Sequence, residues 1–438
     1  MKSLREVYRI GYGPSSSHTM GPRRAAEIFC DRERERNRNP DRNPEHDREC
    51  DRGRERRPAV ERSRVTLYGS LSATGKAHMT DRAVAQGLTP IPTEFVWSPE
   101  THARHPNALR FEALDAGGGV LDDWLVFSVG GGALEDENGP VDAVSPAAYP
   151  AGNIAECLQW CEERNKPFWS LPAETEPDVA DHLAEVWSVM RDCVGRGLES
   201  SEAVLPGGLS LPRKAEAAHA RAQSLGGVMR DMSLLATYAL AVAEENGAGG
   251  KVVTAPTCGA AGVLPAVLYY FRTDQKVGER PIIRALLTAG LFGASVSANG
   301  SVAGAEVGCQ GEIGTGCAMA AAAAAQLLGG SPRQVEYAAE MALEHHLGLT
   351  CDPVLGLVQI PCIERNAFAA MRALDCATYA LLGDGRHVIS FDEVVEVMVA
   401  TGRDLQAAYR ETASGGLAEV WEKRRRRLGT ASDEAASG

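Results

Sequence analysis

The composition of this chain changes near residue 170, and that change constrains the fold more than any other feature. From there on, long segments rich in Ala, Leu and Met carry apolar residues at i, i+3 and i+4 spacing and end at Gly or Pro. This periodicity predicts helices. Several segments are apolar on every side, which is typical of central helices in a bundle. The predicted helices cover residues 179–193, 214–245, 259–271, 282–298, 317–328, 334–346, 363–382 and 391–400.

The part of the chain before residue 170 mixes helix and strand signals. Residues 65–71 and 124–129 are rich in β-branched and aromatic side chains, which predicts strands, and residues 23–29 predict a helix. At 438 residues the chain exceeds the size of one hydrophobic core, so we expect two domains and an α+β fold. The expected parts are a small α/β domain over 1–165, a linker over 166–178, a mostly all-helical domain over 179–428 and a disordered tail over 429–438.

Residues 31–64 form a charged insertion with twelve Arg against ten Asp or Glu. An arm that binds nucleic acid is one interpretation, but the interleaved acids favour a solvated insertion with balanced charge. The whole chain has 45 basic and 58 acidic side chains and a net charge of −13. We therefore expect no nucleic-acid partner held by bulk electrostatics. The basic run at 423–427 is interpreted in the same way, as a solvated helix end.

The sequence predicts a cytoplasmic protein without a membrane segment. No uninterrupted apolar run approaches the roughly 20 residues that span a bilayer, and the first residues, MKSLREVYRI, lack the apolar region of a secretory signal. In a reducing compartment the 11 cysteines do not indicate a disulfide framework. Most are interpreted as small buried apolar residues, and a few are candidate metal ligands.

Three cysteines stand apart because they lie on Gly- and Pro-rich loops at predicted helix ends. They are Cys309, Cys351 and Cys362. The partial positive charge of a helix N-terminus is expected to stabilise the thiolates of Cys309 and Cys362. Three soft ligands with no nearby His or fourth Cys indicate an iron–sulfur cluster with one iron left open, and zinc held by three Cys and water is the alternative.

A further loop in the helical half, residues 254–262, precedes a predicted helix. Thr257 and Gly259 lie in it, and its glycines let a ligand approach backbone N–H groups at a helix N-terminus, which suits an anion. Close approach of two helices explains such glycines equally well.

The N-terminal domain carries two polar clusters, each before a predicted helix start. The first predicts a site for a carboxylate, and the two together predict a substrate cleft that faces the other domain, although serine-rich loops are often only turns and caps. The first cluster comprises Ser15, Ser16, Ser17, His18 and Thr19, and the second comprises Lys76, His78, Thr80 and Arg82.

Several long motifs give the chain a family resemblance. They are GPSSSHTMGP, YGSLSATGKAHMTDRA, VVTAPTCGAAGVLPAVL, GAEVGCQGEIGTGCAMAAA, HHLGLTCDPVLGLVQIPCIERNAFA and YRETASGGLAEV. With these motifs in order, the chain resembles the bacterial iron–sulfur L-serine dehydratases in their single-chain form. The likeness extends over the whole chain apart from the charged insertion and the last residues.

This resemblance implies a 4Fe–4S cluster in the helical catalytic domain, held by Cys309, Cys351 and Cys362. There are two departures from the family pattern. Relatives often end in a cysteine that occupies the open iron without substrate, whereas this chain continues with EVWEKRRRRLGTASDEAASG and has no such cysteine. Cys258 also stands where relatives often carry Asn.

The resemblance also implies the reaction, the deamination of the small molecule L-serine to pyruvate and ammonia through 2-aminoacrylate, with the open iron acting as a Lewis acid on the hydroxyl. Lys76, His78 and His18 are the candidates for the general base, with the Lys76/His78 cluster favoured. The carboxylate is expected to bind to Ser15, Ser16, Ser17, Thr19, Thr257 and Gly259. We expect a homodimer.

Other interpretations stay open at this point. A pyridoxal-phosphate dehydratase would use a lysine Schiff base, for which Lys251 is the best candidate, yet no alternation of strands and helices surrounds it. A hydro-lyase of the same iron–sulfur type acting on another hydroxy or amino acid would need the same ligands. A nucleic-acid adaptor would depend on residues 31–62.

Overall fold

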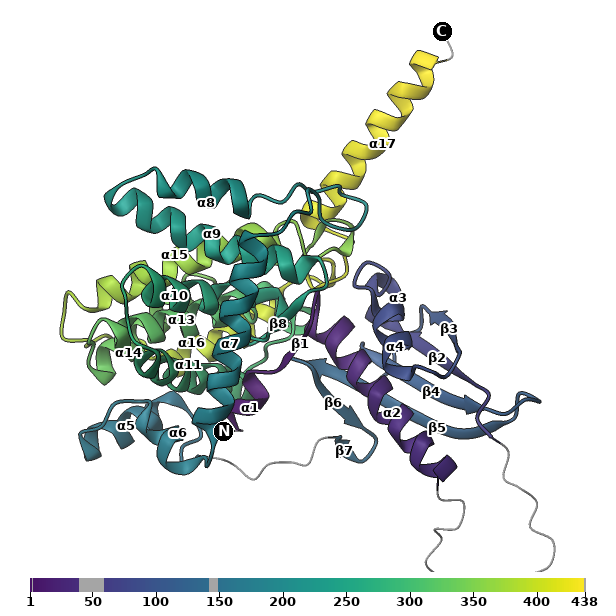
Figure 1. Ribbon diagram of the computed structural model, residues 1–438, viewed down its shortest axis with the longest axis horizontal. Coiled ribbons are helices and arrows are strands. Elements are labelled where there is room, and N and C mark those ends of the chain that lie inside the picture. Colours follow the sequence, from purple (N-terminus) through teal and green to yellow (C-terminus); the bar gives the residue numbers. More distant parts are fainter. Residues whose placement is uncertain (2, 39–58, 142–148, 437–438) are drawn as a thin grey trace, which may run out of the picture. The chain divides into compact units, whose positions relative to one another are not determined.

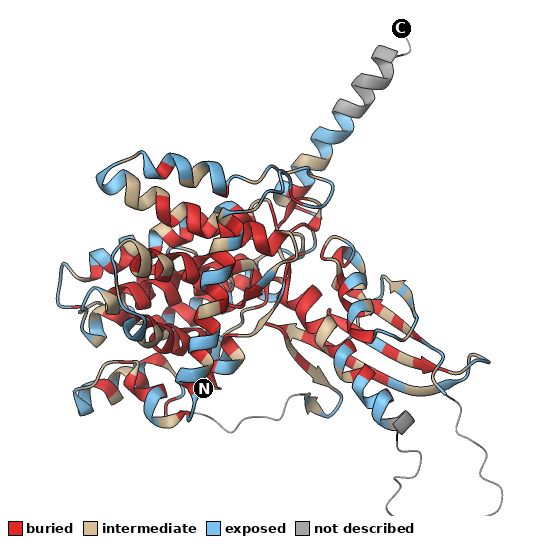
Figure 2. Cartoon of the chain, in the orientation of Figure 1, coloured by how far each residue is buried: buried red, intermediate tan, exposed pale blue. Residues whose placement is uncertain are grey.

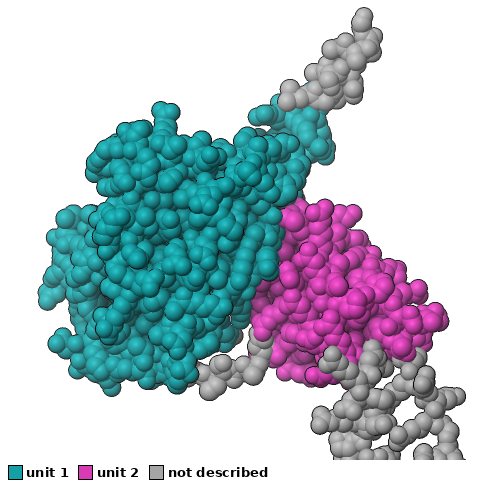
Figure 3. All heavy atoms as spheres, in the orientation of Figure 1, with its two compact units in different colours: residues 1–16, 144–438 teal, residues 17–143 magenta. Residues whose placement is uncertain are grey.

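The computed structural model describes residues 1, 3–38, 59–141 and 149–436, without the side chains of 36–38 and 428–436 (Figure 1). Most of the charged insertion, residues 39–58, therefore lies outside the described residues. The chain divides into two compact units, residues 17–143 and residues 1–16 with 144–438 (Figure 3). The first contains a sheet and the second is largely helical, so the predicted α+β class is confirmed.

The unit of residues 17–143 is built on a six-stranded sheet of order β3-β2-β4-β5-β6-β7. Strands β2 and β3 are parallel and the other neighbours are antiparallel. The strands are β2 (Arg62–Tyr68), β3 (Thr93–Ser98), β4 (Ala108–Leu114), β5 (Val120–Gly130), β6 (Ala133–Asp136) and β7 (Gly139–Pro140). The predicted strand at 65–71 ends early, because Gly69 takes a φ of +51° and begins helix α3 (Gly69–Thr74).

Alternating burial along β2 supplies one layer of the core of this unit. Helices α2 (Gly21–Arg38) and α4 (Thr80–Leu88) pack against each other and against the sheet. The aromatic rings of Phe29, Phe111 and Trp124 meet between helix and sheet, with centroids 5.3 and 5.9 Å apart. Burial of these large apolar rings is the main force that holds α2 on the sheet.

The larger unit is organised around helix α13 (Ile313–Leu327). It packs against α10 (Val263–Thr273), α11 (Glu279–Asn299), α14 (Pro332–Glu344) and α15 (Cys362–Ala380). Every residue from 313 to 325 is buried, as the continuous red of this helix in Figure 2 shows. Its run of Ala side chains lets four neighbours approach closely on all sides, as the all-round apolar pattern predicts.

The remaining predicted helices form with small changes of boundary. The segment 214–245 is two helices rather than one, α8 (Ala215–Gln223) and α9 (Gly227–Gly247), because Gly227 adopts a φ of +55° at the break. The other long helices are α7 (Val179–Leu198), α16 (Phe391–Asp404) and α17 (Gly416–Ala436). Short helices are η1 (Ser16–Met20), α12 (Gly304–Val307), η2 (Cys258–Ala260), η3 (Gly308–Gln310), η4 (Val354–Gly356) and η5 (Ala407–Tyr409).

The compact units divide the chain differently from the predicted domain boundaries. Residues 1–16 group with the helical unit, because β1 (Ile10–Tyr12) pairs antiparallel with β8 (Lys251–Val253) and α1 (Leu4–Val7) packs against α11. The segment that contains α5 (Ile154–Arg164) also groups with the helical unit, because α5 packs against α14 and α16. Helix α6 (Ser170–Thr175) lies in the segment predicted as a linker, and α17 extends through 429–436 of the predicted tail.

Helix α11 is long and apolar enough, by length and composition, to cross a membrane. However, 72% of its apolar stretch is buried inside the unit. Core helices of soluble proteins have the same composition, and this one packs against α13.

Candidate functional site

The three predicted metal ligands are buried in the helical unit. Cys309 lies in η3 just before α13, Cys351 follows α14, and Cys362 is the first residue of α15; their exposed fractions are 3%, 3% and 8%. The Sγ atoms of Cys309 and Cys351 and a carboxylate oxygen of Glu312 all lie within 4.8 Å of one another. Segments 42 residues apart in sequence therefore place two thiols and one carboxylate at a single point.

The thiol of Cys362 belongs to the same electrostatic environment. Burial raises its pKa well above the ordinary value, and the nearby charge of Cys309 raises it further. The pKa of Cys351 is also well above its ordinary value, first through a hydrogen bond with Cys309 and then through burial. Desolvation therefore opposes the thiolate form of Cys362, whereas the N-terminus of α15, where this residue lies, is expected to favour it. Bringing thiolates together here requires a positive partner.

Arg365, which was not among the residues singled out from the sequence, is one such partner. Although burial lowers its pKa, the charges of Cys309 and Cys362 raise it above the ordinary value of a guanidinium. Its Nη1 donates a hydrogen bond to the carbonyl oxygen of Thr350 at 2.6 Å, next to Cys351. The available signal was its spacing, because a residue three positions after Cys362 lies on the same side of a helix.

Asn366 joins the start of α15 to the loop that precedes α10. Its Nδ2 donates to the carbonyl oxygens of Gly259 and Cys362 at 2.7 and 2.9 Å, and its Oδ1 accepts from the N–H of Gly262 at 2.9 Å. The side chain is buried and fully bonded. It therefore fixes the predicted anion loop relative to one of the thiols.

Thr257 and Gly259 lie in this loop beside Glu312. Thr257 Oγ1 donates to Glu312 Oε1 at 2.9 Å, and a Cβ added to Gly259 would lie 2.9 Å from the same oxygen. These two residues, predicted from sequence as substrate ligands, are therefore in contact with a carboxylate that adjoins the thiols. The hydroxyl of Thr257 is already engaged in this hydrogen bond.

A second carboxylate, that of the buried Glu411, lies beside this cluster. Its backbone N–H donates to the carbonyl oxygen of Cys351 at 2.8 Å. Burial and the charge of Glu312 raise its pKa to about 8, and burial raises the pKa of Glu312. Neither acid was singled out from sequence. Glu312 had a signal, three residues after Cys309 in the loop, whereas Glu411 had none.

The backbone of Gly304 leaves the space into which these groups point. A Cβ at this position would lie 2.8 Å from Glu312 Oε2, 3.2 Å from Cys351 Sγ and 3.4 Å from Glu411 Oε2. Soft thiolates favour iron–sulfur clusters and zinc among the common metals. The donor set, and the cradle beside Gly304 that a Cβ would fill, therefore fit a thiolate-bound metal group. Cys258 is also buried, and burial raises its pKa. The three ligand atoms grouped within 4.8 Å include neither its Sγ nor that of Cys362.

Within the unit of residues 17–143, His18 and Thr19 of the first predicted polar cluster meet residues of the second. Thr19 Oγ1 donates to the carbonyl oxygen of His78 at 2.7 Å, Thr80 donates to that of His18, and the two imidazole rings lie 4.5 Å apart. Ser15, Ser16, Ser17, His18 and Thr19 are all buried. Lys76 is exposed, with its Nζ 5.3 Å from the ring centroid of Trp97.

The two buried histidines differ in their partners. His18 Nδ1 lies 2.9 Å from Ser17 Oγ, and its Nε2 lies 3.0 Å from Ser70 Oγ. Neither ring nitrogen of His78 has a hydrogen-bond partner within the described part of the chain. Burial lowers the pKa of His18 to about 4 and that of His78 well below its ordinary value. Both imidazoles are therefore neutral near pH 7.

Comparison with known families decides where the chain belongs. The sequence model of the serine dehydratase alpha chain matches residues 64–418, and that of the serine dehydratase beta chain matches residues 3–96. The chain belongs to the serine dehydratase family. The resemblance carried by the sequence motifs is thus confirmed.

The similarity to individual members of the family extends over nearly the whole chain. The chain is 41% identical to the L-serine dehydratase of Streptomyces coelicolor and 40% identical to L-serine dehydratase 2 of Escherichia coli, over 95% of this chain and 98% of each relative. The L-serine dehydratase of Helicobacter pylori is 35% identical over the same shares. Both family regions therefore occur in one polypeptide here, as in these relatives.

Proposed function

We propose that this chain is an L-serine dehydratase, a lyase that converts L-serine to pyruvate and ammonia. The observation that carries the proposal is the 35–41% identity to L-serine dehydratases over 95% of the chain. The buried thiols of Cys309, Cys351 and Cys362 support it from the structural side.

The cofactor that we propose is a 4Fe–4S cluster held by Cys309, Cys351 and Cys362. Three thiolates leave one of the four irons without a protein sulfur ligand, and when bound the cluster supplies a Lewis acid for departure of the β-hydroxyl. Zinc with the same three ligands is the alternative that metal analysis separates.

The residues of the chain supply binding and proton transfer. We propose that hydroxyl and N–H donors of the loops at 15–19 and 257–262 bind the substrate carboxylate, namely Ser15, Ser16, Ser17, Thr19, Thr257 and Gly259. A neutral side chain takes the Cα proton while hydroxide leaves Cβ, which gives 2-aminoacrylate. This enamine tautomerises to an imine, and water then adds at Cα and releases ammonia.

Among the base candidates Lys76, His78 and His18, we favour His78. A general base needs an unprotonated nitrogen that is free to accept a proton. The lowered pKa of His78 provides the neutral imidazole, and both of its nitrogens lack partners among the described residues. Both nitrogens of His18 face serine hydroxyls instead. The exposed Lys76 is retained as the third candidate.

Anaerobic purification followed by iron and sulfide analysis tests the cofactor, and a pyruvate assay on L-serine, D-serine and L-threonine tests the reaction. Cys309→Ala, Cys351→Ala and Cys362→Ala should each remove the visible absorption and the turnover of L-serine. Cys161→Ala is the matched control, because this thiol is equally buried but lies in α5. An active, colourless triple variant would refute the ligand assignment, and zinc without sulfide would refute the cluster.

A cytoplasmic location and a homodimeric state are further parts of the proposal. The described cysteines are all free thiols, which suits a reducing compartment. Light scattering on the purified chain tests the dimer, and cell fractionation tests the location.

A further inference from the structure

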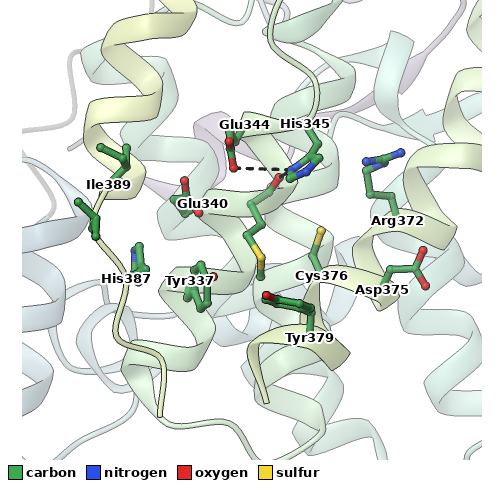
Figure 4. A pocket seen from close by; sticks show the side chains of 12 residues that line it. Tyr337, Glu340, Glu344, His345, Arg372, Asp375, Cys376, Tyr379, His387 and Ile389 are labelled. Atoms are coloured by element: carbon green, nitrogen blue, oxygen red, sulfur yellow. Dashed lines mark hydrogen bonds and ion pairs between the residues drawn. The ribbon is translucent and has the colours of Figure 1, made fainter. Parts of the chain in front are cut away.

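A pocket of about 640 Å³ lies in the helical unit (Figure 4). Helices α14 and α15 form two of its sides, and the segment that joins α15 to α16 forms the third. Its volume falls within the range of small-molecule sites. No residue of the candidate metal centre lines it.

Glu340 of α14 is the unusual group in this pocket. Its exposed fraction is only 4%, and its carboxylate has no hydrogen-bond or ion-pair partner among the residues that the structure describes. Burial, followed by the charges of Glu344 and Glu336, raises its pKa to about 8. A buried carboxylate without a partner is costly, and native proteins normally pair such groups. No described residue of the chain pairs with the carboxylate of Glu340, so a ligand in the pocket can supply the missing partner.

The cations nearest to the pocket are used elsewhere or exposed. His387 Nε2 lies 2.9 Å from Glu336 Oε2, so this ring serves the neighbouring carboxylate. His345 Nδ1 lies 2.8 Å from the carbonyl oxygen of Met341 and 3.7 Å from Glu344 Oε2 in the lining, the contact that is dashed in Figure 4. Arg372 is exposed on the α15 side. The lining also contains three acidic residues, Glu340, Glu344 and Asp375, which outnumber the one arginine. The pocket therefore favours a positively charged ligand.

Two tyrosine rings give the pocket a surface suited to an organic cation. The ring of Tyr337 stacks on that of His387 with centroids 4.4 Å apart. The ring of Tyr379 lies at 72° to the ring of Tyr337, with centroids 6.3 Å apart. Such faces attract ammonium groups through the ring quadrupole. Val388, which is 93% exposed, and Ile389 add apolar surface at the rim. An inorganic cation would leave the rings and this apolar surface unused.

We propose that this pocket binds a small organic ammonium ion, with the ammonium group against Glu340 and the two tyrosine rings and the hydrocarbon chain against Val388 and Ile389. This inference is independent of the proposed reaction. It identifies the ligand by its chemistry, a cationic amine with a short aliphatic chain.

The test uses n-butylammonium chloride as the probe and the full-length chain as the target. We expect saturable binding by isothermal titration calorimetry and a rise of the thermal midpoint with ligand concentration, because a ligand that binds only the folded state stabilises it. Glu340→Gln should weaken binding at least tenfold and, without ligand, should itself raise the midpoint. Tyr379→Ala should weaken binding about fivefold, since this exposed ring contributes a cation–π contact.

Glu396→Gln is the matched control, because this exposed carboxylate on α16 lies outside the pocket lining. It should bind the probe as the parent chain does, and turnover of L-serine should be the same in both glutamine variants without probe. Equal binding to parent and Glu340→Gln, or an equal midpoint rise with sodium chloride, would overturn the proposal. A second result would also overturn it. In that case the thermal midpoint does not change with the probe, rises with protein concentration, and no longer depends on protein concentration in Val388→Asp. A second copy of the chain would then cover the pocket.

Discussion

Asn366 Nδ2 donates a hydrogen bond of 2.7 Å to the carbonyl oxygen of Gly259, across 107 residues of sequence. The same nitrogen donates to the carbonyl oxygen of Cys362, four residues earlier in α15. One amide group thus determines how the loop at 257–262 lies against a thiol.

Asn366→Ala should destabilise the chain and lower its iron content. The change removes the partners of the half-buried carbonyl of Gly259 and the buried N–H of Gly262, at a cost of about 2–3 kcal/mol. Urea unfolding of the metal-free chain measures the first effect, and iron analysis after anaerobic purification measures the second. Asn299→Ala removes an exposed bond to the carbonyl of Gly152 and should cost less than about 1 kcal/mol. Equal losses in the two variants would contradict the role given to Asn366.

Gly304→Ala should abolish cluster binding without unfolding the chain. The added Cβ would lie 2.8 Å from Glu312 Oε2 and 3.2 Å from Cys351 Sγ, so the space beside the thiols is lost, with a packing cost of about 1–3 kcal/mol. Visible absorption and circular dichroism distinguish these effects. Gly195→Ala is the control, since its added Cβ meets nothing within 4 Å in helix α7, and it should stabilise by about 0.5–1 kcal/mol. Full absorption in Gly304→Ala would disprove this use of the space.

Replacement of Arg365 should affect the thiols in two steps. Arg365→Lys keeps a positive charge but loses the planar guanidinium group, whose Nη1 donates to the carbonyl oxygen of Thr350. The loss of this hydrogen bond should lower the free energy of unfolding by about 2 kcal/mol. Arg365→Met also removes the charge beside Cys309 and Cys362, so its iron content should fall below that of the lysine variant. Iron per chain and urea midpoints measure the series. A methionine variant with the full iron content would exclude an electrostatic role.

Stability should fall as the pH drops from 7 to 5. The pKa of His18 is about 4 in the folded chain, against an ordinary value of 6.5. The unfolded state therefore binds more protons in this window, so the free energy of unfolding decreases with acid, by about 2 kcal/mol for this group. Urea unfolding at pH 7 and pH 5 measures it. In His18→Gln the difference between the two pH values should shrink by that amount, and an unchanged difference would show that His18 is not the cause.

The three candidate cysteines could be singled out from the sequence because their signal is local. Cys309, Cys351 and Cys362 lie on or at the end of Gly- and Pro-rich loops beside strongly periodic helices. Glu411 was not predictable, because it reaches the site through the isolated parallel bridge between Cys351 and Arg410. A contact between segments so far apart leaves no periodic pattern in either one.

The domain boundary shows the same limit. Residues 1–16 contain only the four-residue α1 and the three-residue β1, which are too short for periodicity to indicate where they pack. Their place in the helical unit depends on the buried side chains of Leu4 and Tyr8 and on pairing with β8. The break at Gly227 was likewise hidden inside a continuous apolar pattern.

The start of α17 is set by a residue adjacent to a thiol. Asp352 Oδ2 accepts the N–H of Leu417 at 2.7 Å, and Gly416, with a φ of +56°, leaves no room for a Cβ beside that oxygen. The consequence is practical for protein engineering. Insertions or deletions between 411 and 416 shift the anchor of the C-terminal helix and strain the backbone at Cys351, whereas a purification tag fused after Gly438 leaves that anchor untouched.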